Sequence, residues 1–208
     1  MKNNPEVDTW RAVPDVQSIA NAQELEIFDV NGSKVKFGSL FHDKKTIVVF
    51  IRHFFCGVCQ LYVQALCSIP QTALADANVN IVVIGCGEYN PIASYAEAVN
   101  FPPSQMYADP SRKLYRALGM DVENLGKTPS NETKRSYLTM GALSNIAMSL
   151  WRGPIKNPSL IGKNGNISQL GGEFIFGPGS VCSFASRMRH TEDHTEVSEL
   201  AKEAGIEI

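Results

Sequence analysis

The sequence predicts an α/β fold in which a central mixed sheet is flanked by helices. Two short runs, 46–51 and 80–85, are rich in β-branched residues and typical of central strands buried on both faces. Each run is followed by a segment whose apolar residues recur at helical spacing. This alternation of strands and helices indicates a sheet covered on both faces. The length of 208 residues suits one such domain better than two.

The first half of the chain is predicted to form a hairpin followed by alternating strands and helices. Residues 1–20 are expected to be an irregular lead-in, and the domain to occupy 21–208. Residues 25–30 alternate as a strand, Asn31-Gly32 is a turn signal, and 35–37 form the return strand. The strand at 46–51 leads into a helix that begins at Cys56 and that Pro70 stops. Three more elements follow, a strand at 80–85, a helix at 91–99 and a strand at 105–108.

The second half contains an insertion before the fold closes. Asp109-Pro110 predicts a helix start and Gly119 its end. Residues 120–166 do not fit the alternation, and we interpret them as an insertion with one amphipathic helix over 140–151. Segments 172–176 and 181–188 form a second hairpin around a Gly-Pro-Gly-Ser turn. Asp193 with Glu196 resembles a capping box for a last helix that ends at Gly205.

Composition excludes several classes of function. The formal net charge of -2 gives no surface for nucleic acid or an anionic membrane. The most apolar run is far shorter than the roughly 20 residues that a membrane span needs, and the polar N-terminus does not resemble a signal peptide. Cysteines occur five times without framework spacing, which favours a reducing compartment and predicts a cytoplasmic protein.

The cysteine pair Cys56 and Cys59 is the strongest functional signal. It lies where a buried strand gives way to a helix, and the N–H groups and partial positive charge of a helix N-terminus favour thiolate over thiol. Such sites lower the pKa of a cysteine from about 8.5 to roughly 3.5–7.5, and Arg52 and His53 can add positive charge. The C-x-x-C spacing puts both sulfurs within disulfide reach, so these four residues form the predicted catalytic site.

Other interpretations of the polar residues remain open at this point. A zinc half-site would need two further ligands, and no second C-x-x-C exists, so no metal is expected. His190 and His194 are four apart, but we interpret them as solvated surface histidines. Cys86 and Cys182 are interpreted as small apolar fillers.

Trp151 and Arg152 end the predicted insertion helix. They are either a core aromatic with a surface arginine or part of a lid over the cysteine pair. In the second case Arg152 would bind a peroxide oxygen, which makes both residues candidates for substrate binding.

Three stretches together resemble one known family. They are the segment 47–59, the unit 109–119, and the segment 169–179 followed by Arg187 and Asp193-His194. In this order they are similar to the peroxiredoxin-like 2 group of the AhpC/TSA superfamily. The resemblance implies a thioredoxin-like fold of peroxiredoxin type and thiol-dependent redox chemistry without an organic cofactor. It also implies substrates that range from hydroperoxides to lipid endoperoxides.

The chain departs from ordinary peroxiredoxins around the cysteines. Their P-x-x-x-[ST]-x-x-C pattern, aligned on Phe50, places Arg52 at the proline and Cys59 at the peroxidatic cysteine. The alignment with thioredoxin instead makes Cys56 the attacking thiol, and we predict that Cys56 has this role. Gly171-Gly172 stand where ordinary peroxiredoxins have an arginine, so Arg52 or Arg152 would replace it.

The leading hypothesis is a thiol oxidoreductase that reduces hydroperoxides, endoperoxides or disulfides and is restored by thioredoxin or glutathione. A homodimer is expected from the resemblance. Two alternatives stay open. One is that the fold serves an enzyme for a specialised small molecule held under the insertion. The other is a non-catalytic redox sensor that responds stoichiometrically.

Overall fold

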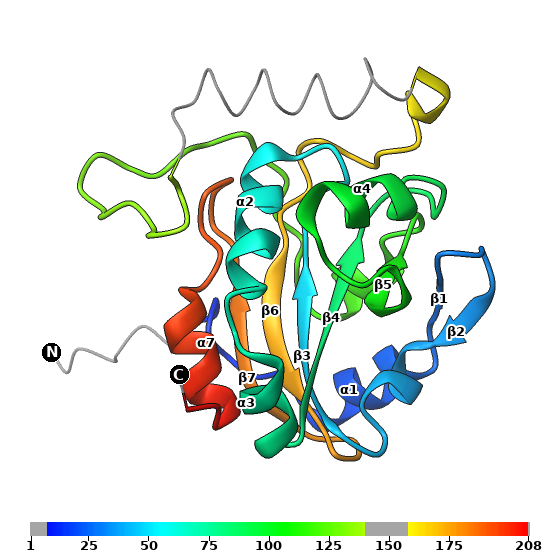
Figure 1. Ribbon diagram of the computed structural model, residues 1–208, viewed down its shortest axis with the longest axis vertical. Coiled ribbons are helices and arrows are strands. Elements are labelled where there is room, and N and C mark those ends of the chain that lie inside the picture. The colour runs from blue at the N-terminus through cyan, green and yellow to red at the C-terminus, as the bar shows by residue number, and fades with distance from the viewer. Residues whose placement is uncertain (1–7, 140–157, 208) are drawn as a thin grey trace, which may run out of the picture.

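A mixed sheet forms the centre of the molecule (Figure 1). The computed structural model describes residues 8–139 and 158–207. Within them the strands form one seven-stranded sheet in the order β2-β1-β5-β4-β3-β6-β7. Neighbours β3, β4 and β5 are parallel and the remaining pairs are antiparallel. The strands are β1 (Glu26–Phe28), β2 (Lys34–Lys36), β3 (Lys45–Phe50), β4 (Val79–Gly85), β5 (Met106–Ala108), β6 (Gly172–Phe176) and β7 (Cys182–Arg187).

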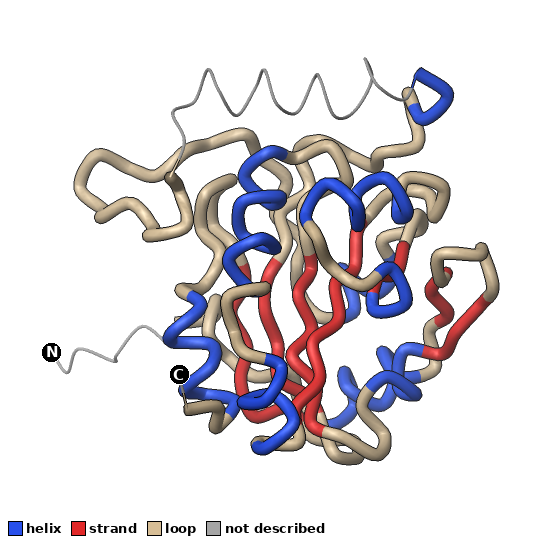
Figure 2. Tube along the Cα trace, in the orientation of Figure 1, coloured by secondary structure: helices blue, strands red, loops and turns tan. Residues whose placement is uncertain are grey.

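Helices cover both faces of this sheet, as the alternation predicted (Figure 2). One buried cluster joins a face of the sheet to α2 (Gly57–Leu66), α3 (Gln71–Asp76), α4 (Ile92–Val99) and α7 (Val197–Ala204). A second joins the other face to α1 (Val16–Gln23), the 3-10 turn η1 (Phe37–Leu40) and α5 (Lys113–Ala117). Short 3-10 turns η2 (Pro103–Gln105) and η4 (Pro158–Leu160) complete the elements. No helix in the described part of the chain is long and apolar enough to cross a membrane.

Strand β3 lies at the centre and explains why its sequence is apolar throughout. It pairs with β4 on one side and β6 on the other, so neither edge is free. Ile47 and Val49 belong to one buried cluster and Val48 and Phe50 to the other, because successive side chains point to opposite faces. The loop that leaves the end of β3 therefore starts from a strand that is buried and paired on both sides.

The structure corrects two predictions in the first half. Residues 16–23 are not part of an irregular lead-in but form α1, which Asp15 caps by accepting a 2.7 Å hydrogen bond from the Ser18 N–H. Helix α2 ends before Pro70, as predicted, but Pro70 also starts α3, an additional helix that the sequence pattern did not predict. Proline is tolerated at a helix start because its missing N–H would have no partner there.

Two predicted caps in the second half are also wrong. Helix α5 begins at Lys113 rather than at Asp109, whose carboxylate instead accepts from the Leu114 N–H at 2.9 Å. Glu196 precedes α7 without capping it, and Asp193 is engaged elsewhere. The second hairpin and the stop at Gly205 are confirmed. The predicted helix over 140–151 lies outside the described residues.

Candidate active site

The cysteine pair lies on the turn that joins β3 to α2. Cys56 occupies the N-cap position, with extended backbone angles, and its Sγ accepts a 3.4 Å hydrogen bond from the Cys59 N–H. A sulfur in this position satisfies one of the orphan N–H groups of the helix start. A negative charge on the Cys56 sulfur is therefore favoured both by this bond and by the partial positive charge of the helix end.

Arg52 contacts both sulfurs of the pair. Its guanidinium Nη1 donates to Cys56 Sγ at 3.4 Å, and its backbone N–H donates to Cys59 Sγ at 3.4 Å. The other guanidinium nitrogen, Nη2, donates to the carbonyl of Ile167. The Arg52 side chain is thus held in place at the sulfurs, and the residue is only 6% exposed.

The electrostatics separate the two thiols. The hydrogen bond from Cys59 lowers the pKa of Cys56 well below its usual value, and the positive charge of Arg52 lowers it further against the effect of burial. Burial raises the pKa of Cys59 well above its usual value, and the neighbouring Cys56 adds to this. A negative charge on the pair therefore belongs to Cys56 rather than to Cys59.

Both residues of the pair are buried, and Cys56 only slightly less than Cys59. Cys56 is 4% exposed, whereas Cys59 is fully buried, and both are free thiols. His53 is also buried, which lowers its pKa and leaves the imidazole neutral at pH 7. Its Nδ1 has no hydrogen-bond partner among the described residues. Cys56 is thus the cysteine with a lowered pKa, and it is almost fully buried.

The remaining cysteines are poor nucleophiles. Burial raises the pKa of Cys86 to about 12 and that of Cys182 to about 11. Cys67 is exposed, at the end of α2, and partial burial of its thiol raises its pKa as well. Trp151 and Arg152, the predicted substrate-binding residues, lie outside the described residues.

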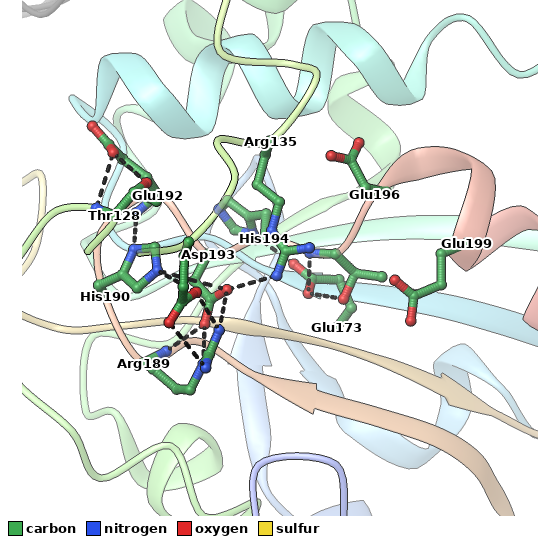
Figure 3. A network of polar contacts seen from close by, with 12 residues as sticks. Thr128, Arg135, Glu173, Arg189, His190, Glu192, Asp193, His194, Glu196 and Glu199 are labelled. Atoms are coloured by element: carbon green, nitrogen blue, oxygen red, sulfur yellow. Dashed lines mark hydrogen bonds and ion pairs between the residues drawn. The ribbon is translucent and has the colours of Figure 1, made fainter. Parts of the chain in front are cut away.

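The prediction that His190 and His194 are solvated is wrong, because they are 6% and 0% exposed (Figure 3). The chain after β7 folds back across the sheet instead of leaving it. The His194 Nδ1–H donates to the carboxylate of Glu173, which stands on the fully buried strand β6. A glutamate in the apolar run 172–176 was the one sequence signal that demanded such a buried polar partner.

His190 lies in a second polar cluster, with Glu132 and Asp193, whose donor set does not suit a metal ion (Figure 3). The His190 Nδ1 accepts from the Glu192 N–H at 3.3 Å, so the ring proton is on Nε2, the nitrogen that faces the carboxylates. Asp193 is already bound by Arg135 and Arg189, each at 2.8 Å. These guanidiniums supply the positive charge that a cation would otherwise bring.

Solved structures show the class of fold. Peroxiredoxin 6 of Arenicola marina superposes with a TM-score of 0.58 at 14% identity, over 88% of this chain and 69% of that one. Prx3 of Vibrio vulnificus, solved in reduced form with H2O2, gives 0.56 at 15% identity, over 88% and 94%. The fold is thus thioredoxin-like and of the peroxiredoxin type.

Sequence relatives define the family within this class. Proteins called peroxiredoxin-like 2C are 34% identical to this chain, over 96% of it and 84% of the Mus musculus protein, and over 90% and 80% for Homo sapiens. The family model of the AhpC/TSA antioxidant enzymes matches residues 67–190. The chain therefore belongs to the peroxiredoxin-like 2 family of the AhpC/TSA superfamily. The region that the family model matches begins after the cysteine pair. The roles of Cys56 and Cys59 are therefore argued from their geometry.

Proposed function

We propose that the protein is a thiol oxidoreductase in which Cys56 attacks the substrate and Cys59 resolves the product. The observation that supports this most directly is the asymmetry of the pair around Arg52. Cys56 has the lowered pKa and Cys59 the raised one, and Cys56 is the slightly less buried residue of the two, at 4% exposure. A nucleophile must be ionised and accessible, whereas a resolving thiol must only be near.

With a hydroperoxide, the reaction is a two-electron reduction of the O–O bond. The Cys56 thiolate attacks the terminal oxygen, the O–O bond breaks, and the rest of the peroxide leaves as an alkoxide that takes up a proton. Cys56 becomes a sulfenic acid. Cys59 then attacks that sulfur, an S–S bond forms, and water leaves. Two electrons from a thiol reductant, thioredoxin or glutathione, restore the dithiol by exchange. A disulfide substrate would follow the same order through a mixed disulfide.

Arg52 and His53 would serve this reaction in different ways. The Arg52 guanidinium touches Cys56, so it stabilises the thiolate and stands where negative charge appears on the leaving oxygen. His53 is neutral because burial lowers its pKa, and in this scheme its ring relays a proton from solvent to the alkoxide. In this scheme Arg52 replaces the arginine that ordinary peroxiredoxins place before the late hairpin strand.

A redox sensor without turnover is the second candidate. The low exposure of Cys56 favours it, because a nearly buried sulfur reacts slowly with large substrates. Turnover with excess reductant separates the two: an enzyme cycles many times, whereas a sensor stops after one equivalent. A specialised small-molecule site under the insertion, a cytoplasmic location and a homodimer stay predictions.

The central test compares the variants Cys56→Ser and Cys59→Ser with the unchanged protein. We expect C56S to lose hydroperoxide and disulfide reduction, and C59S to form a sulfenic acid or mixed disulfide that it resolves slowly. Cys67→Ser is the matched control and should keep full activity, because Cys67 lies at the far end of α2. Full turnover by C56S would contradict the proposal.

A further inference from the structure

A third cysteine contacts the residue that touches the reactive pair. The thiol of Cys86, which directly follows β4, donates to the backbone carbonyl of Arg52 at 2.8 Å. Arg52 thus meets three sulfurs: its carbonyl meets Cys86, its N–H meets Cys59, and its guanidinium meets Cys56. The carbonyl and the N–H belong to the two planar peptide units on either side of Arg52, and hydrogen bonds on both units limit the rotations about φ and ψ that connect them.

Cys86 is suited to be a lasting donor rather than a nucleophile. It is 2% exposed, and burial raises its pKa to about 12, so the sulfur keeps its proton at physiological pH. A thiolate here would repel the Arg52 carbonyl, whereas the thiol donates to it. The sequence predicts an apolar filler at Cys86, and the hydrogen bond adds a polar function to that packing.

The segment 163–167, here called the strap, closes this arrangement from the other side. The Asn164 carbonyl accepts from the Phe54 N–H at 3.1 Å, and the Lys163 carbonyl accepts from the Glu88 N–H at 2.8 Å. Ile167 receives the Arg52 guanidinium. Gly165 packs so closely that an added Cβ would lie 2.7 Å from Cys86 Sγ. The strap therefore packs against Cys86 and also binds the guanidinium of Arg52.

We propose that Cys86 is a positioning residue for the reactive pair, acting through the Arg52 carbonyl to aim the N–H and guanidinium of Arg52 at the two sulfurs. The inference rests on the proposed function, since it concerns the same pair. Loss of the thiol donor should let the peptide unit between residues 52 and 53 turn, so that the contacts of Arg52 to both sulfurs weaken although Ile167 still binds the guanidinium. The reactivity of Cys56 would then depend on a cysteine that takes no part in the chemistry.

The test compares Cys86→Ala with Cys86→Ser by the pH dependence of Cys56 alkylation, followed with iodoacetamide and peptide mass spectrometry on the reduced protein. In C86A we expect the apparent pKa of Cys56 to rise by about one unit, with roughly tenfold slower alkylation below it. C86S keeps a hydroxyl donor and should stay within about twofold of the unchanged protein. Cys182→Ala is the matched control, since Cys182 pairs with Phe176 at the opposite end of the sheet.

Two results would overturn the proposal. One is a C86A protein with an unaltered Cys56 profile. The other is a folded C86S protein that behaves like C86A, which would mean that only sulfur volume matters. If C86A does not fold, the S–H stretching band of Cys86 in the unchanged protein tests whether this thiol donates a hydrogen bond. Assigned by its loss in C86S, it should lie at lower frequency than the S–H band of a simple alkanethiol in an apolar solvent, and equal frequencies would refute the hydrogen bond.

Alkylation of Cys56 is measured independently of turnover. If C56S keeps activity but C86A still raises the pKa of Cys56, the proposed function fails and the positioning role stands. If C56S is inactive but C86A leaves the Cys56 profile unchanged, the positioning role fails and the proposed function stands.

Discussion

The imidazole of His194 lies parallel to the ring of Tyr62, with the centroids 4.2 Å apart and 3° between the planes. Tyr62 belongs to α2 and lies one turn beyond Cys59. The carboxylate of Glu173 holds His194, and it also accepts from the N–H and hydroxyl of Thr195 at 3.1 and 2.9 Å. A fully buried polar group on β6 thus supports the helix that holds the reactive sulfurs.

Replacing Glu173 by glutamine should destabilise the protein strongly. The amide oxygen can replace one acceptor, but its NH2 group would face a donor in a fully buried site, which costs about 2–4 kcal/mol. Urea unfolding measures this loss. Glu199→Gln is the control, because Glu199 binds Arg11 near the surface and that pair should contribute less than about 1 kcal/mol. Equal loss in both variants would contradict the role of Glu173.

Asp193 should make stability depend on pH in the acid range. Burial alone would raise its pKa, but hydrogen bonds from Arg189 and Arg135 lower it from 3.8 to about 2. Because the folded pKa lies below the unfolded one, the stabilisation is complete above about pH 4 and is lost as pH falls to about 2. The unchanged protein should lose about 2 kcal/mol more than Asp193→Asn between pH 5 and pH 2 in urea unfolding. Parallel curves would show that the depressed pKa is absent.

Arg52→Lys should slow the reaction of Cys56 although it keeps the positive charge. The two contacts are made by two different guanidinium nitrogens, and the single ammonium nitrogen of lysine cannot reach both Cys56 Sγ and the Ile167 carbonyl. We expect the pKa of Cys56 to rise and peroxide reduction to fall at least tenfold near pH 6, with recovery at higher pH. Stopped-flow rates against pH measure this. Arg116→Lys is the control on the exposed side of α5 and should match the unchanged protein.

Alkylation of the reduced protein should proceed in a fixed order. At pH 7 iodoacetamide should modify Cys56 well before Cys59, because the pKa of Cys56 is lowered and that of Cys59 is raised. Modification of Cys56 should slow as pH falls through its pKa, since the thiolate is lost. Peptide mass spectrometry reports each site separately. Faster labelling of Cys59 would assign the attacking role to the second cysteine, as the ordinary peroxiredoxin alignment would have it.

The sequence was sufficient where local pattern and burial agree. The β-branched run of β3, the turn signal at Asn31-Gly32 and the helix start at Cys56 each have one good structural solution, and all three predictions are confirmed. The placement of the cysteine pair at a helix N-terminus follows from the same pattern. That placement is a property of neighbouring residues, so it can be read without knowing the fold.

Tertiary structure alone decided which polar residues are buried and what they contact. His194, Asp193 and Cys86 look ordinary in the sequence because their partners Glu173, Arg135 and Arg52 lie 21, 58 and 34 residues away. A polar side chain can stay in solvent, or it can be buried if a residue far away in the sequence forms a hydrogen bond or ion pair with it. The sequence thus determined where a reactive sulfur could form, and long-range packing decided which groups hold it there, because desolvation acts only once the chain has folded.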